Sequence, residues 1–424
     1  MTKSDIKDRE YMYRLITGQL YYDGHQQIAF SLAQHLGITS QIPPPTDKLF
    51  RLVNLAKQFS DDSDTHDTSS DGRKPMDPSA GLDMEYDSEI QPTTPEPSQY
   101  ETIYLTSHKG PCRAAAFSTD GFLVATGSAD CSIKILDVEK IVSSRDMAPN
   151  EGNAEGKNVV FRTLYDHMDE VTTLTFHPRE SLLVSGSSDC TIKMFDYSKS
   201  SLKRAVKTIN EVARINALSF HPGGEFFLAA ADQEIVRLYN SETQQCFVCA
   251  NPADHHKGPI GDIRYSDDGR MFVSGGADGD VKVWDGISNR CIQTFSRAHD
   301  GNAICSVQFT RNGKYVLTSG FDSVVKLWEL STNRCLIAYT GAGSTGPQTL
   351  KIQAGFNHNE DFVMFPDEKS GSLCSWDSRT SDRKRLGALG HTAPCRVFVH
   401  SPTMPAFLTG SDDYRARFWY KSSN

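Results

Sequence analysis

HKGPIGDIRYSDDGRMFVSGGADGDVKVWDGISNRCIQTF, residues 256–295, decides the fold because it reads as four short strands joined by turns. Apolar residues predict strands over 260–265, 270–274, 281–284 and 291–295, with Asp and Gly turn signals between them. The aromatic residue that ends the third strand, Trp284, has counterparts about 44 residues apart at Leu136, Phe195, Tyr239, Trp328, Trp376 and Trp419. A period of ~40–45 residues is typical of propeller blades. The sequence therefore predicts an all-β, seven-bladed propeller over residues 100–424.

The two ends of the repeat array predict how the ring closes. Only five residues follow Trp419, which is too few for a fourth strand, whereas residues 101–106 alternate as a strand ahead of the first unit. We expect that N-terminal strand to complete the last blade, because full closure removes the exposed edges of an open array. The longer interval after Leu136 predicts an insertion in the first unit.

Residues 1–60 have a different, helical pattern and are predicted to form a small all-α domain. Apolar residues at helical spacing indicate helices over 11–20, 26–36 and 47–59. Sixty residues bury a marginal core, so a second copy or the propeller surface must cover their apolar stripes. The candidate residues for a dimer interface are Leu15, Ile16, Leu20, Ile28, Leu32, Leu36, Leu49, Leu52 and Val53.

Residues 61–99 read as an acidic flexible linker, rich in Asp, Ser, Thr and Pro. The segment holds eleven acidic residues against Arg73 and Lys74, so it accounts for the whole net charge of −9. Leu82, Met84 and Tyr86 form an apolar island that alternates with acids. Two interpretations of the island stay open: unstructured chain, or an extended segment that docks on a partner.

Composition excludes several classes of protein. Without the linker the chain is neutral, so it lacks the positive field of a protein that binds nucleic acid non-specifically. There is no run of 18 apolar residues and no signal-peptide core near Met1, so we expect neither a membrane span nor secretion. Ten cysteines are expected to be reduced, without disulfides.

A histidine and an aspartate recur together in most units. Five of the seven units have aspartate six residues before the repeat end, and the histidine lies about 22 residues earlier. A catalytic pair is needed once, whereas a buried carboxylate that accepts from an imidazole is needed in every blade, so we interpret these pairs as structural. The predicted blade network is His108, Asp130, His167, Asp189, His256, Asp278, Trp284, Asp322, Trp328, Trp376, His391, Asp413 and Trp419, with His299 displaced by one residue and with Ser128, Ser187, Ala277 and Ser411 nearby.

The Cys246-x-x-Cys249, His255-His256 cluster has the residue types of a zinc site. Repetition argues against that interpretation, because Cys246, Cys291 and Cys335 each lie seven residues after their repeat end. We predict no metal and no cofactor. The sequence also has neither a Gly-rich phosphate loop nor a Gly-x-Ser-x-Gly elbow, so the protein is not expected to be an enzyme.

Three groups of basic residues are candidates for contact with a partner or with RNA. Arg415 and Arg417 alternate with aromatic residues, as in base-stacking surfaces. A third strand with arginines on one face is the favoured interpretation, because Phe418 and Trp419 fall on core positions of the repeat. The other two groups lie in predicted connections, where a solvated loop is the simpler interpretation. They are Lys203 with Arg204, and Arg383 with Lys384 and Arg385.

The recurring His, Ser, Asp and Trp residues resemble WD40 repeats, and several longer segments give a closer resemblance. YETIYLTSHKGPCR (100–113), TLYDHMDEVTTLTFHP (163–178), DGISNRCI (285–292) and DDYRARFWY (412–420) are similar to the WD-repeat subunit family of cleavage stimulation factor. GLDMEYD (81–87) and the N-terminal helices fit the same family, and residues 15–32 also resemble the LisH dimerisation pattern.

This resemblance implies a nonenzymatic nuclear scaffold that acts in the 3′-end cleavage and polyadenylation of pre-mRNA. The implied partners are a second copy through residues 1–60, the helical-repeat scaffold subunit of the factor and, through it, the RNA-binding subunit. Pre-mRNA would be contacted only indirectly or weakly. Blades three and six depart from the repeat pattern at Gln233, Tyr239 and Ser370, which puts their internal networks in doubt.

A second function class stays open at this point. LisH-like helices followed by a propeller also occur in substrate receptors of ubiquitin ligases and in corepressor subunits. Composition does not separate these classes from an RNA-processing scaffold.

Overall fold

The computed structural model describes residues 13, 15–20, 22, 25–35, 82–84, 96–145, 159–199, 203–342, 351–368 and 371–421. The chain divides into two compact units, residues 1–74 and 75–424. Several predictions fall outside the described residues: the third predicted helix, the interface candidates Leu36, Leu49, Leu52 and Val53, and Ser370 of blade six. Among the described residues, no helix has the length and apolar character needed to cross a membrane.

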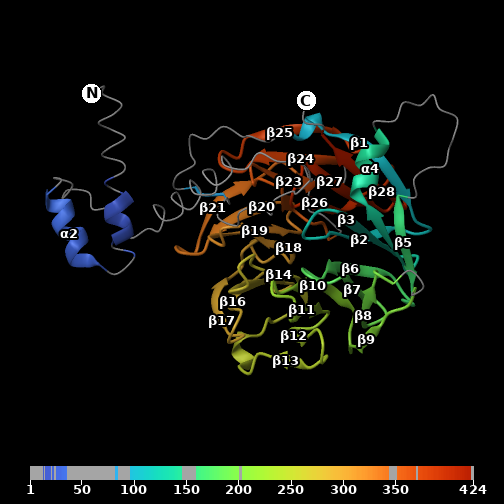
Figure 1. Ribbon diagram of the computed structural model, residues 1–424, viewed down its shortest axis with the longest axis horizontal. Coiled ribbons are helices and arrows are strands. Elements are labelled where there is room, and N and C mark those ends of the chain that lie inside the picture. Colours follow the sequence, from blue (N-terminus) through green and yellow to red (C-terminus); the bar gives the residue numbers. More distant parts are fainter. Residues whose placement is uncertain are drawn as a thin grey trace, which may run out of the picture. The chain divides into compact units, whose positions relative to one another are not determined.

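The larger unit contains seven four-stranded antiparallel sheets, which confirms the predicted propeller. Figure 1 shows the blades arranged as a ring, with the first strand of each blade near the centre and the fourth toward the outside. The first three blades are β2 (Cys112–Phe117), β3 (Leu123–Ser128), β4 (Ser132–Asp137) and β5 (Val160–Tyr165); β6 (Val171–Phe176), β7 (Leu182–Ser187), β8 (Thr191–Asp196) and β9 (Lys207–Asn210); and β10 (Ile215–Phe220), β11 (Phe226–Ala231), β12 (Val236–Asn240) and β13 (Cys246–Val248).

The fourth blade has the predicted bounds in two of its four strands, residues 260–265 and 291–295. It consists of β14 (Ile260–Tyr265), β15 (Met271–Gly276), β16 (Val281–Asp285) and β17 (Cys291–Phe295). Blades five and six follow with β18 (Ile304–Phe309), β19 (Tyr315–Gly320), β20 (Val325–Glu329) and β21 (Arg334–Tyr339); and β22 (Gly355–Phe356), β23 (Phe362–Pro366), β24 (Ser372–Asp377) and β25 (Arg383–Ala388).

The seventh blade closes the ring with a strand from the start of the array, as predicted. Its sheet has the order β1 (Glu101–Ser107), β28 (Arg415–Tyr420), β27 (Ala406–Ser411) and β26 (Cys395–His400). The register of β1 and β28 runs antiparallel from Glu101 opposite Tyr420 to Ser107 opposite Arg415. This pairing gives β28 a partner on both sides, so the blade has no unpaired third strand.

The insertion after Leu136 begins with helix α4 (Val138–Arg145), which lies beside β1 in Figure 1. Val138 and Ile141 are fully buried in an apolar cluster with Met404, Leu408 and Phe418 of blade seven. Asp137 accepts from the Lys140 N–H at the start of the helix, which caps a free backbone donor. The helix therefore packs at the seam where the ring closes.

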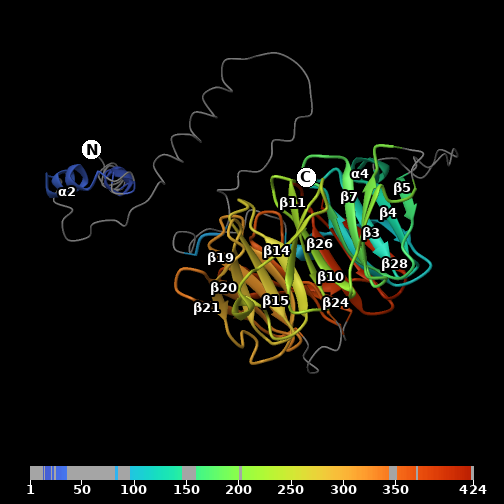
Figure 2. The same cartoon turned by 90° about the horizontal axis from the view of Figure 1, so that it is seen from below.

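The structure departs from the predicted flexible linker in two places. Residues 82–84 pack against blades five and six, where Leu82 is buried, and the 3₁₀ helix η1 (Pro97–Gln99) leads into β1. Figure 2 shows the short blue segment of residues 82–84 beside β19. The sequence left a docked segment open as one interpretation but assigned the contact to a partner, and the structure shows Leu82 packed in the propeller of the same chain.

In the smaller unit, residues 15–20 are helical and helix α2 spans Gln26–His35. The predicted helix over 26–36 is therefore present. Ala29 and Ala33, which are four residues apart and share a helix face, are fully buried.

Candidate interaction surfaces

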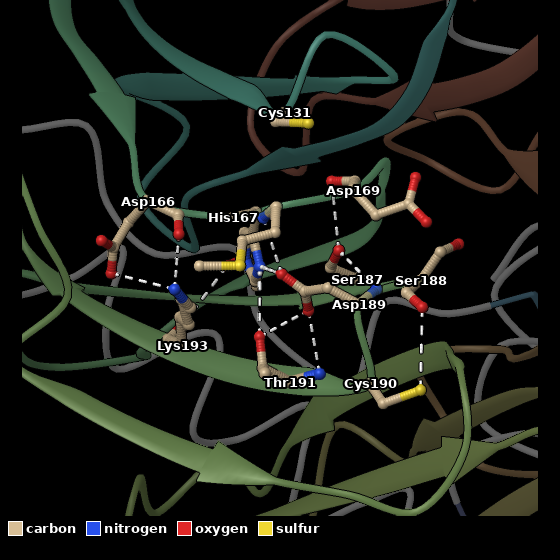
Figure 3. Close-up of polar contacts among 12 residues, drawn as sticks. Cys131, Asp166, His167, Asp169, Ser187, Ser188, Asp189, Cys190, Thr191 and Lys193 are labelled. Atoms are coloured by element: carbon tan, nitrogen blue, oxygen red, sulfur yellow. Dashed lines mark hydrogen bonds and ion pairs between the residues drawn. The ribbon is translucent and has the colours of Figure 1, made fainter.

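The polar network of blade two shows what the recurring histidine and aspartate do. His167 Nδ1 lies 2.9 Å from Asp189 Oδ2, and His167 Nε2 lies 2.6 Å from the Ser185 hydroxyl. Asp189 also accepts from the Thr191 N–H and hydroxyl at 2.9 and 2.6 Å (Figure 3). The carboxylate thus fixes both the imidazole and the turn that leads into β8.

Burial keeps His167 neutral, whereas hydrogen bonds keep Asp189 ionised. Burial lowers the pKa of His167 more than the nearby Asp189 carboxylate raises it, so the ring is neutral at neutral pH. Burial raises the pKa of Asp189, but donors from Thr191, Met168 and His167 outweigh it and lower that pKa to about 2. A neutral imidazole held by a carboxylate can act as a base, yet here its second nitrogen is occupied by a serine inside the blade.

The same His–Asp contact recurs in blades four, five and seven, whereas in blade one His108 Nδ1 lies 3.0 Å from the Ser132 hydroxyl and 3.5 Å from Asp130. The structure also corrects the predicted hydroxyl. The hydroxyl that contacts His Nε2 lies four residues before the aspartate, and in three blades it also accepts from the tryptophan indole at 2.8–3.0 Å. These hydroxyls belong to Thr126, Ser185, Ser274, Thr318 and Thr409. Ser128, Ser187 and Ser411 instead donate to backbone carbonyls across the turn, and Ala277 has no hydroxyl.

Blades three and six replace the network with other contacts. In blade three Glu211 stands where the histidine would be, and it accepts from the Tyr239 hydroxyl and pairs with Arg237 at 3.4 Å. In blade six the Trp376 indole donates to the Thr340 carbonyl at 3.0 Å, and the Tyr339 hydroxyl donates to the Ser378 carbonyl at 2.6 Å. The irregular sequence in these blades therefore changes the network without interrupting the ring.

The Cys-His cluster of blade three does not converge on one point. Cys246 is exposed, whereas the Cys249 thiol lies 3.7 Å from Asp254 Oδ2. His255 Nε2 lies 3.2 Å from the Cys249 carbonyl, and His256 belongs to the blade network. No group of three or more metal-ligating side chains occurs in the part of the chain that the structure describes.

The basic candidates lie on three different blades. Lys203 and Arg204 are exposed before β9, and Arg383 is exposed in β25, a strand where the sequence predicted a connection. Lys384 and Arg385 belong to the same strand. Arg415 is exposed on β28, while Arg417 of that strand donates to the Gly390 carbonyl at 2.6 Å. The structure therefore places these residues apart and does not form one basic patch from them.

A more continuous surface lies on the face of the ring that carries the histidines and their aspartate turns, here called the histidine face. Arg396 and Arg113 both pair with Asp412, Arg113 also pairs with Glu170 at 3.3 Å, and Arg214 pairs with Glu170 at 3.4 Å. This chain of alternating charges runs from blade seven through blades one and two to blade three.

Two exposed apolar side chains lie beside this chain of charges. Met168 directly follows the histidine of blade two and is 90% exposed. Val212 is its counterpart, 44 residues later, after the Glu211 of blade three, and it is 83% exposed. Exposed apolar residues rimmed by charges are typical of a protein-binding surface. The 44-residue spacing relates the two positions, but only His167, which precedes Met168, was a predicted blade residue, and Glu211, which precedes Val212, was not.

The opposite face carries the turns between the first and second strands of the blades and is called the hairpin face. A cavity of about 670 Å³ opens there among the first strands of the seven blades. His358 and His400 stack at its wall with ring centroids 5.3 Å apart. Burial, with the Arg311 charge, lowers the pKa of His358 to about 4. Burial also lowers the pKa of His400, so both rings are neutral at neutral pH and line the cavity.

The N-terminal unit presents the large apolar side chains that the dimer hypothesis requires. Ile28 is 57% exposed, Phe30 52% and Tyr22 58%, whereas Leu15, Ile16, Leu20 and Leu32 are half-buried. Of the predicted interface residues, Ile28 is therefore the most open within the described helices. Phe30 and Tyr22 were not predicted, because their positions fall outside the apolar stripe.

Known proteins resemble both units of the chain. The family model described as cleavage stimulation factor subunit 1, dimerisation domain, matches residues 4–61, and the WD domain model matches residues 99–137, 158–196, 248–285 and 289–329. Cleavage stimulation factor subunit 50 of Arabidopsis thaliana is 36% identical over 325 residues, which covers 76% of this chain and 74% of the relative.

More distant relatives share only part of their length with this chain. Pre-mRNA-processing factor 19 homolog 2 of Arabidopsis thaliana is 30% identical over 47% of this chain and 34% of its own length. COMPASS component SWD3 of Saccharomyces cerevisiae is 24% identical over 45% of this chain and 56% of its own length. Each of these two relatives thus covers less than half of this chain, whereas subunit 50 covers 76% of it.

Proposed function

The chain belongs to the cleavage stimulation factor subunit 1 family, and from this membership we propose that it is a nonenzymatic scaffold subunit in 3′-end cleavage and polyadenylation of pre-mRNA. The observation that carries the proposal is the joint match: the dimerisation model over residues 4–61 and 36% identity over 325 residues. This family is a noncatalytic subunit of cleavage stimulation factor. A ubiquitin-ligase receptor or corepressor subunit is the less favoured function.

The proposed work of the N-terminal helices is to join two copies of the chain. Support comes from the exposed Ile28 and Phe30 on α2 and from the small size of the unit. A dimer would place two propellers, and so two sets of partners, on one transcript. The domain roles follow: residues 1–60 for dimerisation, 61–99 as a spacer anchored near Leu82, and 100–424 as the propeller.

The proposed work of the propeller is to bind the helical-repeat scaffold subunit of the factor, and through it the RNA-binding subunit, in the nucleus. We assign this contact to the histidine face, where Met168 and Val212 lie exposed beside the chain of alternating charges. The separated basic residues suit at most a weak or shared contact with pre-mRNA.

Affinity purification of the tagged full-length chain from nuclear extract tests the proposal. The wild type should recover the other cleavage stimulation factor subunits, and a Met168→Asp/Val212→Asp variant should recover at least about tenfold less, because two interface positions acquire buried charges. Ile287→Asp is the matched control, since Ile287 is 92% exposed in a turn of the hairpin face.

Two outcomes would contradict the proposal at different levels. Recovery of ubiquitin-ligase or deacetylase subunits without cleavage-factor subunits would reject the RNA-processing role. A loss of cleavage-factor subunits in Ile287→Asp but not in the double variant would reject the histidine face as the contact.

A further inference from the structure

Residues 82–84 bind the propeller through their backbone as well as their side chains. The Leu82 N–H donates to Glu360 Oε2 at 2.6 Å, and the Leu82 carbonyl accepts from Asn312 Nδ2 at 2.7 Å. The Met84 N–H donates to the Tyr315 hydroxyl at 3.2 Å, and Asp83 pairs with Lys314 at 2.6 Å. Residues 82–84 therefore contact the propeller in the way that a bound peptide contacts its receptor, through backbone hydrogen bonds and side chains together.

The Leu82 side chain fills a place in the core at the boundary of blades five and six. It is 1% exposed and belongs to a cluster with Tyr315 and Leu317 of β19 and Phe356 and Phe365 of blade six. Blade six has a first strand of only two residues, β22, where the other blades have six. The leucine thus supplies apolar contact at the least regular junction of the ring.

Glu360 occupies a position where four of the other blades have glycine. The turn between the first and second strands holds Gly121, Gly224, Gly269 and Gly313 at positive φ, and Glu360 has φ +60° at the corresponding place. A side chain in this conformation costs about 1 kcal/mol or more. The Glu360 carboxylate is also buried, at 3% exposure, and accepts from the Leu82 and Arg311 N–H groups. The hydrogen bond from Leu82 is a contact that glycine at this position could not make, which explains why a strained, buried glutamate stands here.

Asn312 shows the same adaptation in the turn of blade five. Its Oδ1 accepts from the Thr310 hydroxyl and the Lys314 N–H, as Asp268 Oδ1 does from Ser266 and Arg270 in blade four. Either residue type can therefore make the turn. Only the asparagine has an N–H₂ group, and it donates that group to the Leu82 carbonyl.

We propose that the Leu82–Met84 segment is a built-in docking motif for a groove between blades five and six, lined by Asn312, Tyr315 and Glu360, and that it anchors the acidic segment to the propeller. The spacer between the N-terminal helices and the propeller then runs over residues 61–81 and not over 61–99. At ~3.3–3.6 Å per residue its greatest length falls from roughly 130 Å to roughly 70 Å. The anchor would limit how far apart two propellers of a dimer can lie.

Hydrogen exchange on the full-length chain tests the anchor, because two of its contacts are backbone N–H groups. In the wild type the Leu82 and Met84 amides should be protected. Glu360→Gly restores the common turn residue and Asn312→Asp keeps the turn acceptor, so both variants should fold. Each should reduce protection at Leu82 and Met84 by at least about tenfold, the effect of losing one hydrogen bond, and leave the blade interiors protected.

Asp268→Asn is the matched control, since it makes the reverse change in the blade-four turn and should not affect residues 82–84. Unprotected Leu82 and Met84 amides in the wild type would overturn the proposal, as would unchanged protection in both groove variants. A carbodiimide cross-link between Asp83 and Lys314 should leave the denatured chain at monomer mass. Dimer mass would show the motif docked on the second copy and would overturn the anchor within one chain. None of these results depends on the role in RNA processing.

Discussion

At the residue scale, the recurring histidines are buried and connect neighbouring strands through hydrogen bonds at both ring nitrogens. In blade four the Ser274 hydroxyl lies between His256 Nε2 at 2.7 Å and the Trp284 indole at 2.8 Å, so one small group satisfies two large buried rings. Sequence spacing found the histidine, aspartate and tryptophan. It assigned the hydroxyl to residues just before the aspartate, because serine is common at that turn. The structure shows that the hydroxyl facing the imidazole belongs to the residue four positions before the aspartate.

Removal of that hydroxyl should destabilise the propeller. Ser274→Ala leaves a buried indole N–H and an imidazole nitrogen without partners, which should lower the free energy of unfolding by about 2–4 kcal/mol. Ser288→Ala, in the exposed turn of the same blade, should change it by less than about 0.5 kcal/mol. Denaturant unfolding of the two variants checks this, and equal effects would refute a connecting role for Ser274.

The buried histidines also predict how stability depends on pH. Burial lowers the pKa of His108 to about 4 and lowers the pKa values of His167 and His391. Between pH ~6.5 and ~4 the unfolded chain therefore binds protons that the folded chain does not, and stability should fall as the pH falls through this range. His108 alone should contribute on the order of 3 kcal/mol of that loss. Urea unfolding at pH 7.5, 6.5, 5.5 and 4.5 measures it, and a flat profile would contradict the buried, neutral assignment.

At the element scale, strands whose turns carry Asp and Gly were predictable and those of blade six were not. Val281–Asp285 and Cys291–Phe295 follow directly from apolar runs between turn signals. Blade six has a two-residue first strand, and its junction with blade five is completed by Leu82, which lies far away in sequence. The local sequence pattern carries no information about such a long-range contact, so residues 82–84 were included in the predicted linker.

The closing strand gives a test at this scale. Deletion of the seven residues of β1 from the full-length chain leaves β28 as an open edge and removes Ile103 and Tyr104 from their cluster. The free energy of unfolding should fall by at least about 4 kcal/mol, given ~1 kcal/mol per net hydrogen bond and the lost apolar burial.

The matched control for this deletion removes residues 62–68, an equal length from the acidic segment, and should leave stability nearly unchanged. Thermal unfolding and size-exclusion chromatography make the comparison. Equal behaviour of the two deletions would show that β1 does not close the ring.

At the scale of the whole molecule, two different surfaces carry the proposed function. The sequence predicted part of the N-terminal surface but not the surface on the propeller. The helical spacing identified Ile28, because a small domain with an apolar stripe requires a cover. It did not identify Phe30 or the pair Met168 and Val212. Met168 and Val212 lie one repeat apart, but the repeat spacing does not tell an exposed apolar residue from a buried one, because exposure depends on the neighbouring blades.

The N-terminal surface predicts the oligomeric state of the full-length chain. Sedimentation should give a dimer for the wild type, and Ile28→Asp/Phe30→Asp should give a monomer, since a dimer interface does not tolerate unpaired buried charges. Leu105→Asp is the control, because Leu105 is 39% exposed on β1 in the other unit. A wild type that stays monomeric at all concentrations would contradict the dimer.

Restoration of cleavage tests the scaffold account most directly. A nuclear extract depleted of the endogenous subunit would receive the recombinant chain and a pre-mRNA with a polyadenylation signal, and the fraction of RNA cleaved at the 3′ end would be measured. The account predicts that wild type restores cleavage and that the Met168→Asp/Val212→Asp variant, equally folded, does not. Cleavage that is unaffected by depletion, or that folded wild type fails to restore, would contradict a role as a scaffold of 3′-end processing.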